Sequence, residues 1–185
     1  MATTNLRAGR FVESENDPRT DKPRQGAEKE MLIGFLRWQR ETLELKCSGM
    51  DAEQLTRRAV KPSTMSLLGL IRHMADVERS WFRRYMDGQD VPHHFLTRDN
   101  PDANFDGAVA DPEVVDEAWR LWREEIMFAD QYVADTDLDL LGGRPDDKHD
   151  QRSLRWVLLH MIEEYARHLG HADLLRERID GRIGM

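Results

Sequence analysis

Cysteine is almost absent from this 185-residue chain, which contains one, Cys47. A single cysteine excludes an internal disulfide framework, a Cys-x-x-Cys redox pair and a zinc site caged by thiolates. Long apolar runs are also lacking, because no stretch reaches the roughly 18 apolar residues that indicate a membrane span. Residues 1–30 have no apolar centre of the kind that signal peptides carry. We therefore expect a soluble, cytoplasmic protein with no membrane partner.

Basic residues are too few to predict a nucleic-acid partner. Lys and Arg number 27 against 35 Asp and Glu, which gives a formal net charge of −8. The basic residues that do occur stand next to acids, so no basic stripe is expected on the surface. Apolar residues make up 39% of the chain and charged residues 34%, a balance that favours amphipathic helices over buried strands.

The apolar residues that are present recur at helical intervals from about residue 28 onward. Residues 1–26 instead carry many disorder-promoting types, which predicts a flexible N-terminal arm followed by one domain over 27–185. The intervals of three and four, together with capping residues and terminal glycines, predict four helices. Their expected ranges are about 28–47, 64–87, 112–134 and 153–178, with Ser63 or Thr64 capping the second.

Four long amphipathic helices predict an all-α fold, a four-helix bundle. Alternating β patterns and hairpin turns are missing, so no sheet is expected. The segment 89–110 contains two prolines and one glycine and is long enough to cross the bundle. The sequence therefore predicts a crossover between the second and third helices.

The positions of the histidines indicate where a chemical site could be. His160, Glu164 and His168 stand four residues apart, so they share one face of the last predicted helix. His73 lies in register with the core residues of the second helix. A Glu and a His one turn apart, with a His from a facing helix, can hold one metal ion and leave positions open for water or substrate. A polar seam of hydrogen-bonded core side chains would give the same spacing, so spacing alone leaves both interpretations open.

Other familiar metal and nucleophile patterns are absent. There is no Glu-x-x-His pair, which a ferritin-like di-iron centre repeats, and no His-Glu-x-x-His motif of the zinc proteases. No serine has a local nucleophile signature, so a catalytic triad is not predicted.

Two segments carry a resemblance to a known family. Residues 66–82 read SLLGLIRHMADVERSWF, and residues 154–181 read LRWVLLHMIEEYARHLGHADLLRERIDG. Together they resemble the DinB-like superfamily, and within it an actinobacterial branch related to mycothiol-dependent maleylpyruvate isomerase. The resemblance covers roughly residues 28–181 and implies a four-helix bundle with a crossover between helices two and three.

The resemblance also implies a divalent-metal site. In that superfamily the ligands are one His on the second helix and two residues four apart on the last helix. By this resemblance, the metal ligands of this chain are His73, Glu164 and His168. A Glu and a His on the last helix match the ligand pair of the thiol-dependent isomerase. His160 and His171 are then pocket or cofactor-binding residues on either side of the pair. Zinc or nickel is the expected metal.

Several neighbouring side chains are further candidates for the site. Arg167 and Arg72 are candidates to bind an anionic group of a thiol cofactor, with a surface ion pair as the favoured alternative for each. Glu163 and Glu78 are candidates to orient a ligand histidine. Among the remaining residues of interest we expect His93, His94 and His149 to be exposed, Cys47 to be buried, and Trp119 and Trp122 to be core residues rather than an interface.

The family resemblance implies a metal-dependent enzyme, a thiol transferase or isomerase. It would use a low-molecular-weight thiol such as mycothiol on a small electrophilic substrate. The nucleophile is then the sulfur of that thiol, so no catalytic side chain is assigned. A non-catalytic metal- or ligand-binding protein of stress response or detoxification is the alternative, and a structural dimer with a vestigial site is the third. A homodimer is a further expectation from the resemblance.

Overall fold

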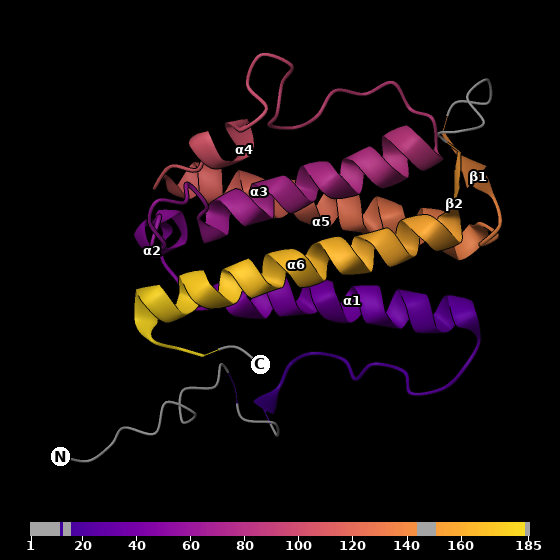
Figure 1. Ribbon diagram of the computed structural model, residues 1–185, viewed down its shortest axis with the longest axis horizontal. Helices are drawn as coiled ribbons and strands as arrows, with labels where there is room; N and C mark the ends of the chain where they lie inside the picture. Colours follow the sequence, from indigo (N-terminus) through magenta and orange to yellow (C-terminus); the bar gives the residue numbers. More distant parts are fainter. Residues whose placement is uncertain (1–11, 13–15, 144–150, 184–185) are drawn as a thin grey trace.

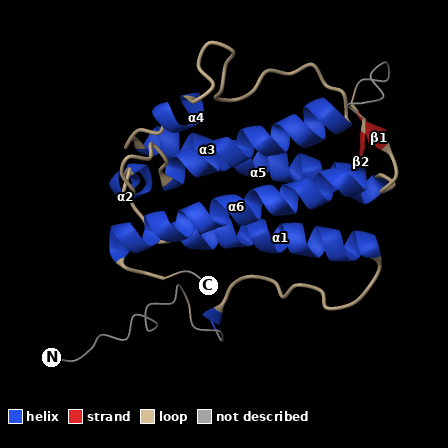
Figure 2. Cartoon of the chain, in the orientation of Figure 1, coloured by secondary structure: helices blue, strands red, loops and turns tan. Residues whose placement is uncertain are grey.

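The computed structural model describes residues 12, 16–143 and 151–183, in which four long helices lie side by side (Figures 1 and 2). Helix α6 packs against both α1 and α3, and α5 packs against α3. The predicted all-α fold is confirmed. The long helices are α1 (Glu28–Cys47), α3 (Leu67–Glu78) with its π-helical continuation η3 (Arg79–Met86), α5 (Pro112–Asp135) and α6 (Leu154–Asp180); the short ones are α2 (Ala52–Thr56) and α4 (Ala103–Asp106).

The crossover between the second and third long helices is present. Helices α3 and α5 run in the same direction in Figure 1, so the segment 87–111 returns the chain along the length of the bundle and carries α4 on its way. Asp76 fixes this segment, because its buried carboxylate accepts the backbone N–H groups of His94 at 2.6 Å and Leu96 at 3.0 Å. The prediction of a crossover is therefore confirmed.

The ends of the helices follow local capping chemistry. The Asp111 carboxylate accepts the Glu113 N–H at 2.9 Å at the start of α5. The second long helix starts at Leu67, so the caps expected at Ser63 or Thr64 are wrong. Ser66 is the cap, since its Oγ accepts the N–H of Gly69 at 3.1 Å.

The expectation of no sheet is wrong in one small detail. Strands β1 (Leu141–Gly142) and β2 (Arg152–Ser153) pair antiparallel immediately before α6. Strands of two residues are too short to show an alternating pattern, so no pattern in the sequence indicated them. Gly142 permits the pairing to sit on the end of η3, because a Cβ there would lie 2.7 Å from the sulfur of Met86.

The described part of the N-terminal arm contacts α1. The guanidinium of Arg19 lies 4.0 Å from the ring centroid of Trp38, and its Nη1 donates to Thr42 Oγ1 at 3.1 Å. Residues 1–11 and 13–15 of the predicted arm lie outside the described residues. Among the described helices, none has both the length and the apolar character needed to cross a bilayer.

Candidate metal centre

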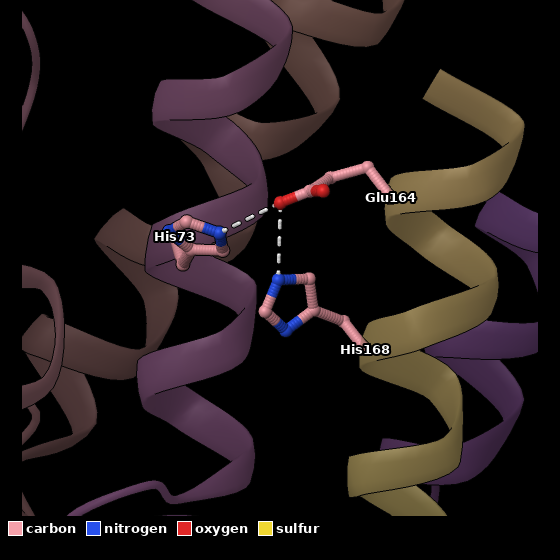
Figure 3. Close-up of side chains that lie close together, drawn as sticks. All are labelled: His73, Glu164 and His168. Atoms are coloured by element: carbon pink, nitrogen blue, oxygen red, sulfur yellow. Dashed lines mark hydrogen bonds and ion pairs between the residues drawn. The ribbon is translucent and has the colours of Figure 1, made fainter. Parts of the chain in front are cut away.

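Three side chains from two helices meet in the seam between α3 and α6 (Figure 3). Glu164 Oε1 lies 3.5 Å from His73 Nε2 and 3.2 Å from His168 Nε2. The ring centroids of the two histidines are 4.6 Å apart. One candidate ligand atom from each of the three residues lies within 4.8 Å of the others, and the described residues contain no second such group of three.

Helix geometry explains why these residues, and not their neighbours, form the cluster. Glu164 and His168 are one turn apart on the face of α6 that packs against α3. The side chains of Glu164 and His168 are 14% and 12% exposed, whereas those of Glu163 and Arg167 are 67% and 58% exposed. The side chain of His73, at 25%, is also only partly covered. The cluster is therefore enclosed on the helix side and open toward solvent at its rim.

The surroundings hold the three groups in the protonation states that metal ligands need. Burial lowers the pKa of His73, and burial together with the nearby His73 lowers the pKa of His168 to about 4. Burial alone would raise the pKa of Glu164, but attraction to the two histidines outweighs it and leaves that pKa below its usual value. At neutral pH the cluster consists of two neutral imidazoles and one carboxylate.

One buried atom of the cluster has no hydrogen-bond partner. His73 Nε2 is enclosed, and its 3.5 Å contact with Glu164 does not meet the geometry of a hydrogen bond. An unsatisfied buried nitrogen costs about 1–3 kcal/mol, so its retention calls for a ligand. Nitrogen and carboxylate donors at this spacing suit a divalent ion such as zinc. The residues present therefore fit the metal that the sequence led us to expect.

Phe105 is a neighbour that sequence reasoning missed. It lies on α4, and its ring stacks on His73 with centroids 5.8 Å apart and planes at 27°. Gly69, one turn before His73, makes room for it, because a Cβ at that position would lie 2.5 Å from Phe105 Cδ1. The glycine was the only local signal, since Phe105 belongs to the crossover segment.

The expected cofactor-binding residues surround the cluster in different ways. His171 Nδ1 lies 3.4 Å from His168 Nδ1, so it touches the cluster directly. His160 instead stacks on Trp156, one turn further from the cluster. Arg167 is on the outer surface, 3.6 Å from Glu163 and 3.5 Å from Glu164. The surface ion pair that we favoured for Arg167 is thus present.

The ion pair favoured for Arg72 is wrong, and the candidate role of Glu78 is not found. Arg72 is not in a surface ion pair: it is 7% exposed, and its Nε donates to the carbonyl of Asn104 at 2.9 Å. Glu78 does not orient a histidine, because its carboxylate is fully buried against Arg40 and Tyr165. Glu163 points to solvent beside Arg167 and makes no contact with the cluster in the described structure.

The loop histidines also differ from expectation. His93 and His94 are both partly buried rather than exposed. His94 Nε2 lies 2.9 Å from Glu125, whose carboxylate is buried, and His93 lies 3.9 Å from Asp76. Buried carboxylates on distant helices attract them, which the sequence of the loop does not show. His149 lies outside the described residues. Cys47 is buried as predicted.

The fold and the cluster define the class as the DinB-like all-α proteins with a candidate metal centre. The sequence model of the mycothiol-S-transferase family matches residues 31–181. The chain therefore belongs to the mycothiol-S-transferase family, and the resemblance to the DinB-like superfamily is confirmed.

Comparison with curated proteins gave no match. Among solved structures, the chain is similar to one described as the "conserved protein of locus from Enterococcus faecalis". The TM-score is 0.58 at 15% identity, and the match covers 85% of this chain and 99% of the other. At that identity the likeness shows the fold alone.

Proposed function

We propose that this protein is a metal-dependent S-transferase that joins the sulfur of a low-molecular-weight thiol to a small electrophile. The observation that carries the proposal is the His73–Glu164–His168 cluster, with two neutral imidazoles, one carboxylate and an unsatisfied His73 Nε2. Membership of the mycothiol-S-transferase family supports the same chemistry and names mycothiol as the thiol.

His73, Glu164 and His168 would hold a divalent ion, zinc or nickel. Two neutral ligands and one carboxylate leave a divalent ion with a net charge of about +1. When bound, such an ion lowers the pKa of a coordinated thiol, so that the sulfur is a thiolate at neutral pH. The three side chains supply position and charge, and the partly exposed rim leaves room for the incoming thiol.

The chain cannot supply the reacting sulfur itself. Cys47, its single cysteine, is 4% exposed at the end of α1. Burial raises the pKa of the Cys47 thiol from 9.0 to about 12, which keeps it protonated and unreactive at neutral pH. A thiol from solution is therefore the only sulfur nucleophile that the proposed reaction can use.

His171 has a positioning role in this proposal. If His168 Nε2 binds the ion, the proton of its neutral ring is on Nδ1, which can then donate to Nδ1 of His171, 3.4 Å away. Such an outer partner fixes the tautomer and orientation of a ligand histidine. His160 and Arg167 remain proposed contacts for the bound thiol, one on either side of Glu164 along α6.

A pair of adjacent glutamates provides the decisive experiment. Glu164→Gln changes an inward ligand, whereas Glu163→Gln makes the same change at the neighbouring position, 67% exposed. Protein purified without an affinity tag is analysed for bound metal and assayed with mycothiol and a bimane electrophile. We expect Glu164→Gln and His168→Ala to lose metal and turnover, and Glu163→Gln to keep both. Unchanged metal content in Glu164→Gln and His168→Ala would overturn the proposal.

A further inference from the structure

A row of side chains along α6 extends beyond the candidate metal centre. Trp156, His160, Glu164 and His168 follow one another at four-residue intervals, so all four lie on one helix face. The first two are aromatic and the last two belong to the cluster. Any molecule that reaches the cluster along the α3–α6 seam from the start of α6 therefore passes Trp156 and His160.

Trp81 completes an aromatic group from the opposite helix. Its ring centroid lies 4.7 Å from that of His160 and 5.4 Å from that of Trp156. The rings of His160 and Trp156 are stacked, with centroids 5.0 Å apart and planes at 10°. We call these three side chains, Trp81, Trp156 and His160, the aromatic wall.

The π-helical segment explains how Trp81 reaches α6. In an uninterrupted α-helix a side chain eight residues after His73 would be rotated by about 80° around the axis, away from the seam. Segment η3 begins at Arg79, and its bonds run between residues five apart, as from Asp87 N to Phe82 O at 3.0 Å. Each residue of such a segment turns less, so Trp81 is carried back toward the face that bears His73. Short π segments recur at functional sites.

The aromatic wall is not a sealed part of the core. Phe82, the neighbour of Trp81, is fully buried, but Trp81 is only partly buried and Trp156 is 40% exposed. In the described structure His160 makes ring contacts and no hydrogen bond with other side chains. The wall is therefore partly accessible, chiefly at Trp156, although the guanidinium carbon of Arg152 also lies 4.9 Å from the Trp156 ring centroid.

We propose that the aromatic wall binds the flat, conjugated part of the electrophile and makes the protein selective for aromatic electrophiles over small aliphatic ones. This inference rests on the proposed S-transferase function. Offset-stacked and edge-to-face ring pairs are worth about 0.5–1.5 kcal/mol beyond area burial, so a preference of up to about tenfold is expected. Glu164 follows His160 by one helical turn on the same face of α6, so the aromatic wall adjoins the candidate metal centre.

Two maleimides with the same reacting bond test the selectivity. In either compound the thiolate sulfur bonds to one alkene carbon, the π electrons move to the other carbon, and that carbon takes a proton from water. N-phenylmaleimide carries the ring and N-methylmaleimide does not. After subtraction of the uncatalysed rate, we expect kcat/KM to be up to about tenfold higher for the phenyl compound. In Trp81→Leu we expect the values of kcat/KM for the two compounds to become equal.

Equilibrium binding separates this inference from the proposed function. N-phenylsuccinimide and N-methylsuccinimide are unreactive analogues, and their binding to the full chain is measured by ligand-observed NMR without any thiol. We expect tighter binding of the phenyl analogue, with the difference lost in Trp81→Leu and reduced in Trp156→Leu. Trp119→Leu, which removes a partly buried indole packed against Trp122 on α5, is the matched control and should keep the difference.

The outcomes are distinct. Preferential binding of the phenyl analogue without turnover of either maleimide would support the binding role of the aromatic wall and refute the S-transferase function. Equal binding and equal turnover of the phenyl and methyl compounds would refute the binding role of the wall. A preference that survives in both Trp81→Leu and Trp156→Leu would refute it too. Circular dichroism checks that each variant is folded. If Trp81→Leu does not fold, Trp156→Leu, which changes an exposed side chain, tests the aromatic wall instead.

Discussion

Arg40 on α1 and Glu78 on α3 form a bidentate ion pair in the centre of the bundle. Arg40 Nε donates to Glu78 Oε1 at 2.8 Å, and Nη2 donates to Oε2 at 2.7 Å. Tyr165 on α6 donates to the same carboxylate at 2.7 Å and accepts the indole N–H of Trp122 on α5 at 2.9 Å. One network of buried polar groups thus joins all four long helices, and each member has its partner.

Removing Glu78 should destabilise the fold more than an ordinary core substitution does. Glu78→Ala leaves the Arg40 guanidinium, 5% exposed, without its main counter-charge. We expect the free energy of unfolding in urea to fall by about 3–5 kcal/mol. The double variant Arg40→Met/Glu78→Leu removes both charges and should recover most of the loss. A change below about 1 kcal/mol in Glu78→Ala would contradict this account.

Changing His171 should weaken metal binding without abolishing it. His171 contacts the proposed ligand His168 through the two Nδ1 atoms but does not join the three-residue cluster. Outer partners of this kind contribute about 10–100-fold to metal affinity. We expect His171→Ala to lose affinity in that range in a chelator competition, and His160→Ala, one turn away, to retain it. Equal affinities in the parent and His171→Ala would remove the positioning role.

Loss of the Asp76 carboxylate should loosen the crossover segment. Asp76 is 1% exposed and accepts three backbone N–H groups, those of His94, Phe95 and Leu96. Asp76→Ala leaves these donors without an acceptor, at a cost of about 1–3 kcal/mol for each group that stays buried. We expect faster amide hydrogen exchange at residues 94–96. Asp87→Ala, an exposed position at the end of η3, is the control and should exchange like the parent.

Cys47 should be unreactive in the folded protein and dispensable for turnover. Because its pKa is about 12 when folded and 9.0 ordinarily, the unfolded thiol ionises first as the pH rises. The contribution of Cys47 to stability is therefore complete below pH 9.0 and declines by about 1.4 kcal/mol per pH unit between the two values. The stability of Cys47→Ala, measured by denaturant unfolding, should lack this decline. We also expect Cys47→Ala to keep its S-transferase activity. Loss of activity in a folded variant would contradict the proposal that a thiol from solution supplies the reacting sulfur.

Interactions within one helix were readable from the sequence. The spacing of apolar side chains fixed the long helices to within a few residues, because an α-helix has one period wherever it occurs. The same geometry placed Glu164 and His168 on one face, and the register of His73 with core residues pointed it inward. The family motif then identified which three of these residues to expect together.

Contacts between distant segments were decided by the tertiary structure. The sequence did not reveal that Phe105 stacks on His73, that Asp76 and Glu125 hold the loop histidines, or that a π segment directs Trp81 toward α6. Each depends on how one element lies on another, which side-chain spacing within an element does not encode. The sequence by itself therefore determined the helices and the ligand face of α6, whereas packing decided what surrounds the cluster, because burial and distance arise only when the helices assemble.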